Sequence, residues 1–149
     1  MSSLFDPASL LNADLGEGST RREPLPVGEP IAQITKVDIK SGESQKGKWM
    51  RLDVSLEISD QDYMATYLDG TQDKAMTNFG IMLDSDAHGG IAVGPNKNIR
   101  LNRFREACCV NGKPLSALIG QYVRVSIQHK PAYNDPSQIA DDITGFSKV

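Results

Sequence analysis

The sequence lacks the features of a secreted or membrane protein. Its only two cysteines, Cys108 and Cys109, are adjacent, and neighbouring cysteines rarely form a disulfide because the bridge would be strained. No apolar run approaches the roughly 18 residues that a membrane span needs. The opening stretch "MSSLFDPASLLNADLGEG" has neither the basic start nor the long apolar run of a secretory signal. We therefore expect a cytoplasmic protein in a reducing environment, with no membrane partner.

Catalytic and metal-binding signatures are also scarce. The chain has two histidines. His129 follows Ile127 on the inward side of a predicted strand, where a structural role is the simpler interpretation. Asp84, Asp86 and His88 are spaced like loop ligands of a metal, but such residues more often cap turns. The chain has no phosphate-binding loop or nucleophile elbow, and the cysteine pair lacks the second pair that zinc requires. We predict no enzymatic activity, no cofactor and no metal.

The charge is low overall but unevenly distributed. The net charge is −3, which argues mildly against nucleic-acid binding. From Ala87 onward, however, eight cations face only four anions, so this segment carries +4 and the remainder −7. A local basic face, rather than the total charge, decides whether phosphates are attracted.

Short segments with an apolar residue at every second position dominate the rest of the chain. This period is typical of strands with one face in a core. We predict strands over residues 31–40, 49–58, 74–83, 121–130 and 139–149, with a bulge in the first, a loop over 41–48, a helix over 98–110 and a short second helix before residue 120. The fold class is thus mainly β with a helical insert (α+β), and five short strands around one insert suggest a small antiparallel five-stranded OB-like barrel.

The first 29 residues have no such period and contain prolines that favour an extended chain. We predict an extended N-terminal arm over residues 1–29, followed by a single domain over 30–149 with its helical insert at 98–119. The arm would dock on its own domain or on a neighbouring copy, giving a homo-oligomer.

Aromatic and cationic residues share the polar faces of two predicted strands. Trp49, the only tryptophan, alternates with Arg51, and Tyr122 alternates with Arg124. Single-stranded nucleic acid is bound by this combination, since rings stack on bases while cations contact phosphates. Lysines in the first hairpin, a tyrosine in the last loop and arginines on the helix would extend such a surface. The candidate nucleic-acid-binding residues are Lys46, Lys48, Trp49, Arg51, Lys97, Arg100, Arg103, Tyr122, Arg124 and Tyr133.

A purely structural interpretation of these pairs stays open. Trp49 begins its strand and would pack against the apolar patch of Leu4 and Phe5 in the arm. Arg51 and Arg124 would pair across strands with carboxylates such as Asp53, which is ordinary sheet stabilisation. Exposed aromatic–arginine pairs also occur at protein interfaces.

Four stretches resemble a group of small tailed-phage proteins from the DNA-metabolism and recombination region, some of them described as single-stranded DNA-binding. They are "LFDPASLLNADL", "PLPVGEPIAQITKVDIKSGESQKGKWMRLDVSLEI", "GPNKNIRLNRFREACCVNGKP" and "LIGQYVRVSIQHK". None of them is catalytic. The resemblance implies that Lys46, Lys48, Trp49, Lys97, Arg100 and Arg103 are family features.

These observations favour a phage-encoded, non-enzymatic protein of the host cytoplasm that binds single-stranded DNA in replication or recombination. The sequence does not separate DNA from RNA. Two alternatives stay open: a virion or assembly protein that uses its arm for contacts between copies, and an anti-defence protein that binds a host protein.

Overall fold

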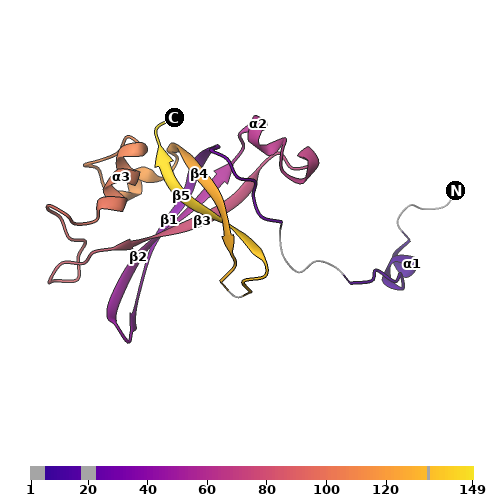
Figure 1. Cartoon of the computed structure of the whole chain (residues 1–149), viewed down its shortest axis with the longest axis horizontal. Coiled ribbons are helices and arrows are strands. Elements are labelled where there is room, and N and C mark those ends of the chain that lie inside the picture. The colour runs from indigo at the N-terminus through magenta and orange to yellow at the C-terminus, as the bar shows by residue number, and fades with distance from the viewer. Residues whose placement is uncertain (1–5, 18–22, 134) are drawn as a thin grey trace.

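The computed structural model describes residues 6–17, 23–133 and 135–149, which form one antiparallel sheet with few helices (Figure 1). The order of the five strands in the sheet is β3-β2-β1-β4-β5. The strands are β1 (Ile31–Ser44), β2 (Gly47–Ile58), β3 (Ala75–Leu83), β4 (Tyr122–Pro131) and β5 (Ile139–Ser147). The helices are α1 (Pro7–Leu11), α2 (Gln61–Met64) and α3 (Ile99–Ala107), with 3-10 turns η1 (Leu68–Gly70) and η2 (Leu115–Leu118).

The mainly β, antiparallel character predicted from the alternation is confirmed, and each predicted strand is found. The predicted bulge in the first strand is also found, as a register shift between Ile34 and Lys36. The predicted 41–48 loop was wrong, because residues 41–44 pair with 47–50 and leave only Gln45 and Lys46 at the tip of the hairpin. Polar residues form this extension, so no apolar period marked it.

The core lies on one face of the sheet and beneath α3. Along β2 the residues Leu52, Val54, Leu56 and Ile58 are fully buried and alternate with partly exposed polar residues. From α3, Phe104 is fully buried and stacks edge-on against Phe79 of β3 and Phe146 of β5, with ring centroids 5.3 and 4.8 Å apart. The helical insert therefore packs on the core face of the sheet.

The sheet is open rather than closed into a barrel. Its edges are β3 and β5, and no ladder joins them among the described residues. Side chains span the gap instead. The rings of Phe79 and Phe146 lie 5.1 Å apart, and Arg100 of α3 donates to the carbonyl of Gly80 in β3 (3.4 Å) and to that of Ile143 in β5 (3.5 Å). The two edges thus approach each other without pairing.

Residues 23–30, which we call the strap, are built into the body. Leu25 is fully buried, its amide donates to a carboxylate oxygen of Asp141 (2.9 Å), and its carbonyl lies 2.7 Å from the His129 ring. The phenols of Tyr63 and Tyr67 donate to the Pro26 and Glu23 carbonyls (2.6 and 3.0 Å). Further on, Gly28 pairs with Ile127 of β4. The C-terminal part of the predicted arm therefore contributes to the core.

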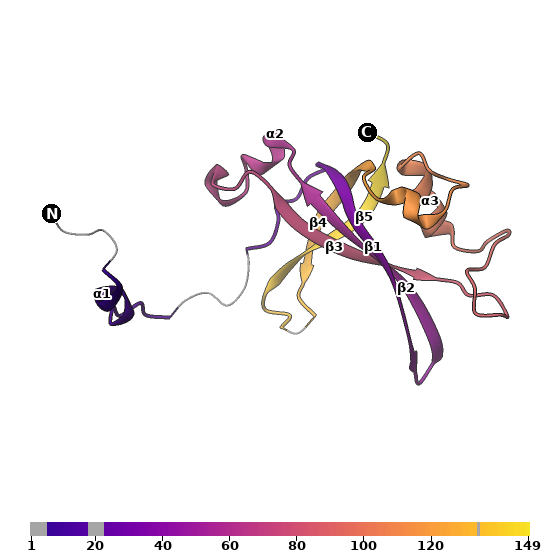
Figure 2. The same ribbon diagram turned by 180° about the vertical axis from the view of Figure 1, so that it is seen from behind.

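The described arm residues 6–17 lie apart from the body, and α1 stands well away from the sheet in both views (Figures 1 and 2). The Asp6 side chain caps α1 by accepting from the Ala8 amide (3.2 Å). Within the described part of the chain, every helix falls short of the length and apolar character that crossing a bilayer requires.

Candidate nucleic-acid interface

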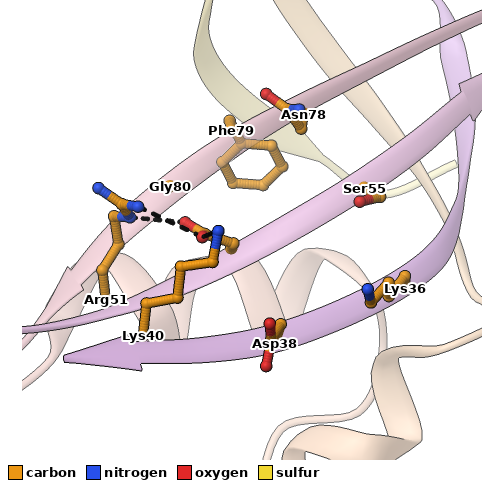
Figure 3. Close-up of a pocket in the computed structure, with 9 residues that line it drawn as sticks. Lys36, Asp38, Lys40, Arg51, Ser55, Asn78, Phe79 and Gly80 are labelled. Carbon is orange, nitrogen blue, oxygen red and sulfur yellow. Dashed lines mark hydrogen bonds and ion pairs between the residues drawn. The ribbon is translucent and has the colours of Figure 1, made fainter.

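A groove of about 400 Å³ crosses β1, β2 and β3 on the face opposite the core (Figure 3). Antiparallel pairing places Lys40 beside Arg51, Asp38 beside Asp53, and Gly80 on the other side of Asp53. Its lining residues, which define the outer groove, are Lys36, Asp38, Lys40, Arg51, Asp53, Ser55, Asn78, Phe79 and Gly80. Three cations and two carboxylates therefore share this surface.

Trp49 lies at the hairpin end of the same face. Its cross-strand partner is Gly42, and a Cβ on that glycine would lie 2.7 Å from the indole Cζ2. The missing side chain therefore lets the indole lie flat on the β1 backbone. The Arg51 guanidinium carbon lies 5.4 Å from the ring centroid. Trp49 is half-buried as a result, between the glycine below and the arginine beside it.

Arg51 is fixed across the floor of the groove. Its Nε and Nη2 donate to the two carboxylate oxygens of Asp53 (2.6 and 3.3 Å), and Lys40 pairs with the same carboxylate (3.3 Å; Figure 3). Hydrogen bonding to Arg51 holds the pKa of Asp53 below its ordinary value, and the same bond raises the pKa of Arg51. A Cβ on Gly80 would meet Arg51 Cδ at 2.7 Å, so a second glycine accommodates the arginine stem.

The pairing of Arg51 with a carboxylate follows the structural interpretation of the sequence, although the partner is on the same strand. The other part of that interpretation, a cover of Leu4 and Phe5 over Trp49, lies outside the described residues. Among the described residues, Trp49 is partly exposed and lies next to Arg51, which lines the groove.

The second aromatic–cation pair is separate from the first. Tyr122 pairs with Gln33 near the start of β1, whereas Arg51 pairs with Lys40 further along. Seven residues of strand separate these positions, which corresponds to roughly 23 Å. Tyr122 is exposed, while Arg124 donates to the Glu29 carbonyl of the strap (3.0 Å). The structure does not bring the two pairs onto one platform.

The loop candidates are well exposed. Lys46 is at the tip of the β1–β2 hairpin, and Lys48 has an ammonium group 4.0 Å from Glu43, at the limit of an ion pair. Tyr133, in the β4–β5 loop, is 99% exposed. Both hairpins extend toward the same side of the molecule (Figures 1 and 2). Lys46 and Tyr133 lie in the two hairpin loops and Lys48 lies on β2 beside the first of them, so all three could flank a bound strand.

The candidates around α3 differ from one another. Arg100 joins the sheet edges, as described above, and its guanidinium carbon lies 5.6 Å from the Phe146 ring centroid. Lys97 and Arg103 are exposed. Asn98 is the N-cap residue of α3, but its side chain bonds to Asp84 and Ala92 instead of the helix. Arg100 is therefore engaged in the fold, and Lys97 and Arg103 remain accessible.

The 84–98 loop uses its carboxylates internally. Asp84 accepts from the Asn98 amide (2.8 Å), and Asp86 accepts from the amides of His88 and Gly90 (both 2.8 Å). Across residues 6–17, 23–133 and 135–149, no group of three or more His, Cys, Asp or Glu could hold a metal ion. His129 is exposed rather than buried, but its ring lies 2.7 Å from the Leu25 carbonyl of the strap, which agrees with the predicted structural role.

Sequence reasoning did not identify Lys36, Lys40 or the two glycines as parts of the site. The alternation of Lys36, Asp38 and Lys40 with apolar neighbours did place all three on one polar face. The glycines became meaningful only through strand register, which sets Gly42 under Trp49 and Gly80 beside Asp53.

Comparison with known proteins adds no assignment. No known family model matches the chain, and no curated protein matches it with significance. The function is therefore argued from the outer groove and its surroundings.

Proposed function

We propose that the protein binds single-stranded DNA along the outer groove, and that it serves replication or recombination in a phage-infected cell. The observation that carries the proposal is the flat arrangement of Trp49 and Arg51 over two glycines, at one end of a groove lined by cations. Flat aromatic and guanidinium groups are the surfaces on which unpaired bases stack, at about 1–3 kcal/mol per base. The resemblance to phage DNA-metabolism proteins supports the same proposal.

We further propose that the open sheet is an OB-like barrel without the closing ladder. Its strand order β3-β2-β1-β4-β5, the helix between β3 and β4, and the side-chain contacts between the two sheet edges support this assignment. In OB folds the face of strands 2 and 3 and the loops 1–2 and 4–5 bind oligonucleotides. The corresponding features here are the outer groove, the Lys46 hairpin tip and the Tyr133 loop.

Charge determines how a strand would lie on this face. Asp38 and Asp53 repel phosphates from the middle of the groove, whereas the Asp38 carboxylate can accept hydrogen bonds from exocyclic amines of bases. The backbone would therefore follow the cations Lys40, Lys46 and Lys48, with the bases turned toward Trp49. Because Asp53 already neutralises part of the arginine charge, we expect moderate affinity and a clear dependence on salt.

The test is a titration of the protein with oligonucleotides of about 16 nucleotides, at salt from about 50 to about 200 mM. Trp49 is the only tryptophan, so its fluorescence reports directly on the site. We expect quenching on binding and an affinity that falls with salt. DNA and RNA of the same sequence are compared in parallel, and a clear preference for RNA would contradict the assignment to DNA.

The matched variants are Lys46→Ala with Lys48→Ala, against Lys148→Ala as the control. All three lysines are exposed, but Lys46 and Lys48 lie on the hairpin next to Trp49, whereas Lys148 is beyond the end of β5. We expect the double variant to reduce affinity and flatten the salt dependence, by about 0.7 in the logarithmic slope for each lost phosphate contact. If the wild type shows neither quenching nor complex formation at low salt, the proposal is wrong.

A further inference from the structure

Three leucines of the arm lie uncovered at a distance from the body. Leu10 and Leu11 of α1 and the following Leu15 are 56%, 85% and 87% exposed, and no residue of α1 is buried. Single exposed leucines are common in folded proteins. Three within six residues form an apolar surface, and its burial against another surface would be favourable. The described arm therefore presents an apolar segment without an apolar partner in the body.

The local sequence favours the helix, but it is too short to be stable alone. Asp6 caps its start, Pro7 occupies the first turn, and the Asn12 side chain donates to the Ala8 carbonyl (2.9 Å). Helices shorter than about 12 residues are marginal in water, because nucleation costs more than a few hydrogen bonds return. A surface that receives the leucines would supply the missing stability.

The arm is also acidic. Residues 6–17 contain Asp6, Asp14 and Glu17 and no lysine or arginine, so this segment carries −3. A complementary surface would combine exposed apolar side chains with cations.

The start of α3 offers this combination. Val93 and Ile99 are 91% and 46% exposed, and Lys97 and Arg103 are exposed as well. Ile99 and Arg103 are one helical turn apart and share a side of α3. Asn98 bonds to the Ala92 carbonyl (2.9 Å), which keeps Val93 next to the beginning of the helix. We call Val93, Lys97, Ile99 and Arg103 the α3 patch.

The arm and the α3 patch are at opposite ends of the molecule. Figures 1 and 2 show α1 at one extreme of the long axis and α3 near the other, with the sheet between them. The root of the arm is fixed to the body through the strap, by the Tyr67 bond to Glu23 and the burial of Leu25. Since the sheet lies between α1 and α3 of one chain, the α3 patch that α1 reaches without crossing the sheet is that of a second copy.

We propose that the arm of one copy docks on the α3 patch of a second copy, with Leu10, Leu11 and Leu15 against Val93 and Ile99, and Asp14 and Glu17 near Lys97 and Arg103. Such a contact joins two different surfaces, so it builds chains or rings when each arm reaches a new copy and a closed pair when two copies exchange arms. If the proposed function holds, copies linked in this way bind neighbouring stretches of one strand cooperatively.

The first test measures mass against protein concentration by sedimentation, without DNA. We expect the wild-type mass to rise with concentration above that of the monomer. Leu11→Ser with Leu15→Ser should weaken the association by about tenfold or more for each leucine that the contact buries. Ala13→Ser is the matched control and should behave as the wild type. A wild type that stays monomeric, or an association that Leu11→Ser with Leu15→Ser leaves unchanged, would overturn the proposal.

The second test exchanges charges. Lys97→Glu with Arg103→Glu should abolish association, and combining it with Asp14→Lys and Glu17→Lys should restore it. If association is lost and the combined variant does not restore it, the arm docks elsewhere and the α3 patch is not its docking site. Lys148→Glu is the control for a change of surface charge.

DNA measurements separate this inference from the proposed function. On an oligonucleotide long enough for one copy only, Leu11→Ser with Leu15→Ser should bind as well as the wild type, whereas on a long strand it should lose cooperativity. If no form of the protein binds the short oligonucleotide, the proposed function fails, while the sedimentation results still decide the arm contact.

Discussion

Asp53→Asn should strengthen the binding of single-stranded DNA. In the wild type this carboxylate holds Arg51 through two hydrogen bonds (2.6 and 3.3 Å) and pairs with Lys40 (3.3 Å). The asparagine is nearly the same size, so it removes the charge and leaves the shape of the groove intact. Both cations then become available to phosphates.

The size of the effect follows from the groove charges. Three cations and two carboxylates line the outer groove, and the change leaves one carboxylate, Asp38. Each additional phosphate contact by a cation steepens the logarithmic salt dependence of single-strand binding by about 0.7, so Arg51 and Lys40 together should steepen it by up to about 1.4. The cost in stability should stay below about 1 kcal/mol, because partly exposed ion pairs contribute little.

The assay is Trp49 quenching by a short oligonucleotide across a salt series, for the wild type and Asp53→Asn. Asp142→Asn is the matched control, since Asp142 also pairs with a lysine at 3.3 Å, on β5 and outside the groove. Urea unfolding of the three proteins checks that the fold is retained. Weaker binding or an unchanged salt slope for Asp53→Asn would show that DNA does not use the outer groove.

The contribution of Asp53 to the stability of the fold should be lost only at low pH. Because the Arg51 bond lowers the pKa of Asp53 from 3.8, its contribution to stability is complete above that value and is lost as the pH falls through the folded-state pKa. Three further expectations concern the core, the thiols and the indole. Phe104→Ala should cost about 3–5 kcal/mol in urea unfolding, since the ring is fully buried between two others; unfolding as in the wild type would contradict this packing. One thiol per chain, that of the exposed Cys109, should react with a thiol reagent in the native state, because burial raises the pKa of Cys108 to about 12; two fast thiols would contradict its burial. Gly42→Ala should shift Trp49 emission to the red by lifting the indole off the sheet, whereas Gly145→Ala, with ordinary contacts from 3.7 Å, should not.

The strands could be predicted because burial of one face imposes a period of two residues. In β2 this period is complete from Leu52 to Ile58. The helix α3 could be predicted because Leu101, Phe104 and Cys108 follow a helical spacing, and all three are buried, with Cys108 at the C-cap. These elements have in common that their sequence directly reflects contact with the core.

The strap and the outer groove lacked such a signal. Leu25 is a single apolar residue between two prolines, and its burial depends on Tyr67, His129 and Asp141, which are distant in sequence. The groove requires the register of three strands, which alternation alone does not specify. The sequence therefore identified Trp49 and Arg51 as outward-facing neighbours, but not the carboxylate and the glycines that hold them in place.

Because the strap is packed into the body, the folded unit begins at Glu23 rather than at Ile31, the first residue of β1. A shortened chain that begins at Ile31 would lose the fully buried Leu25, and would leave two tyrosine hydroxyls and a histidine without their carbonyl partners in the strap. A chain that begins at Glu23 keeps all of these contacts. Fluorophores and purification tags are thus best joined ahead of Glu23, where they lengthen the arm without disturbing the core.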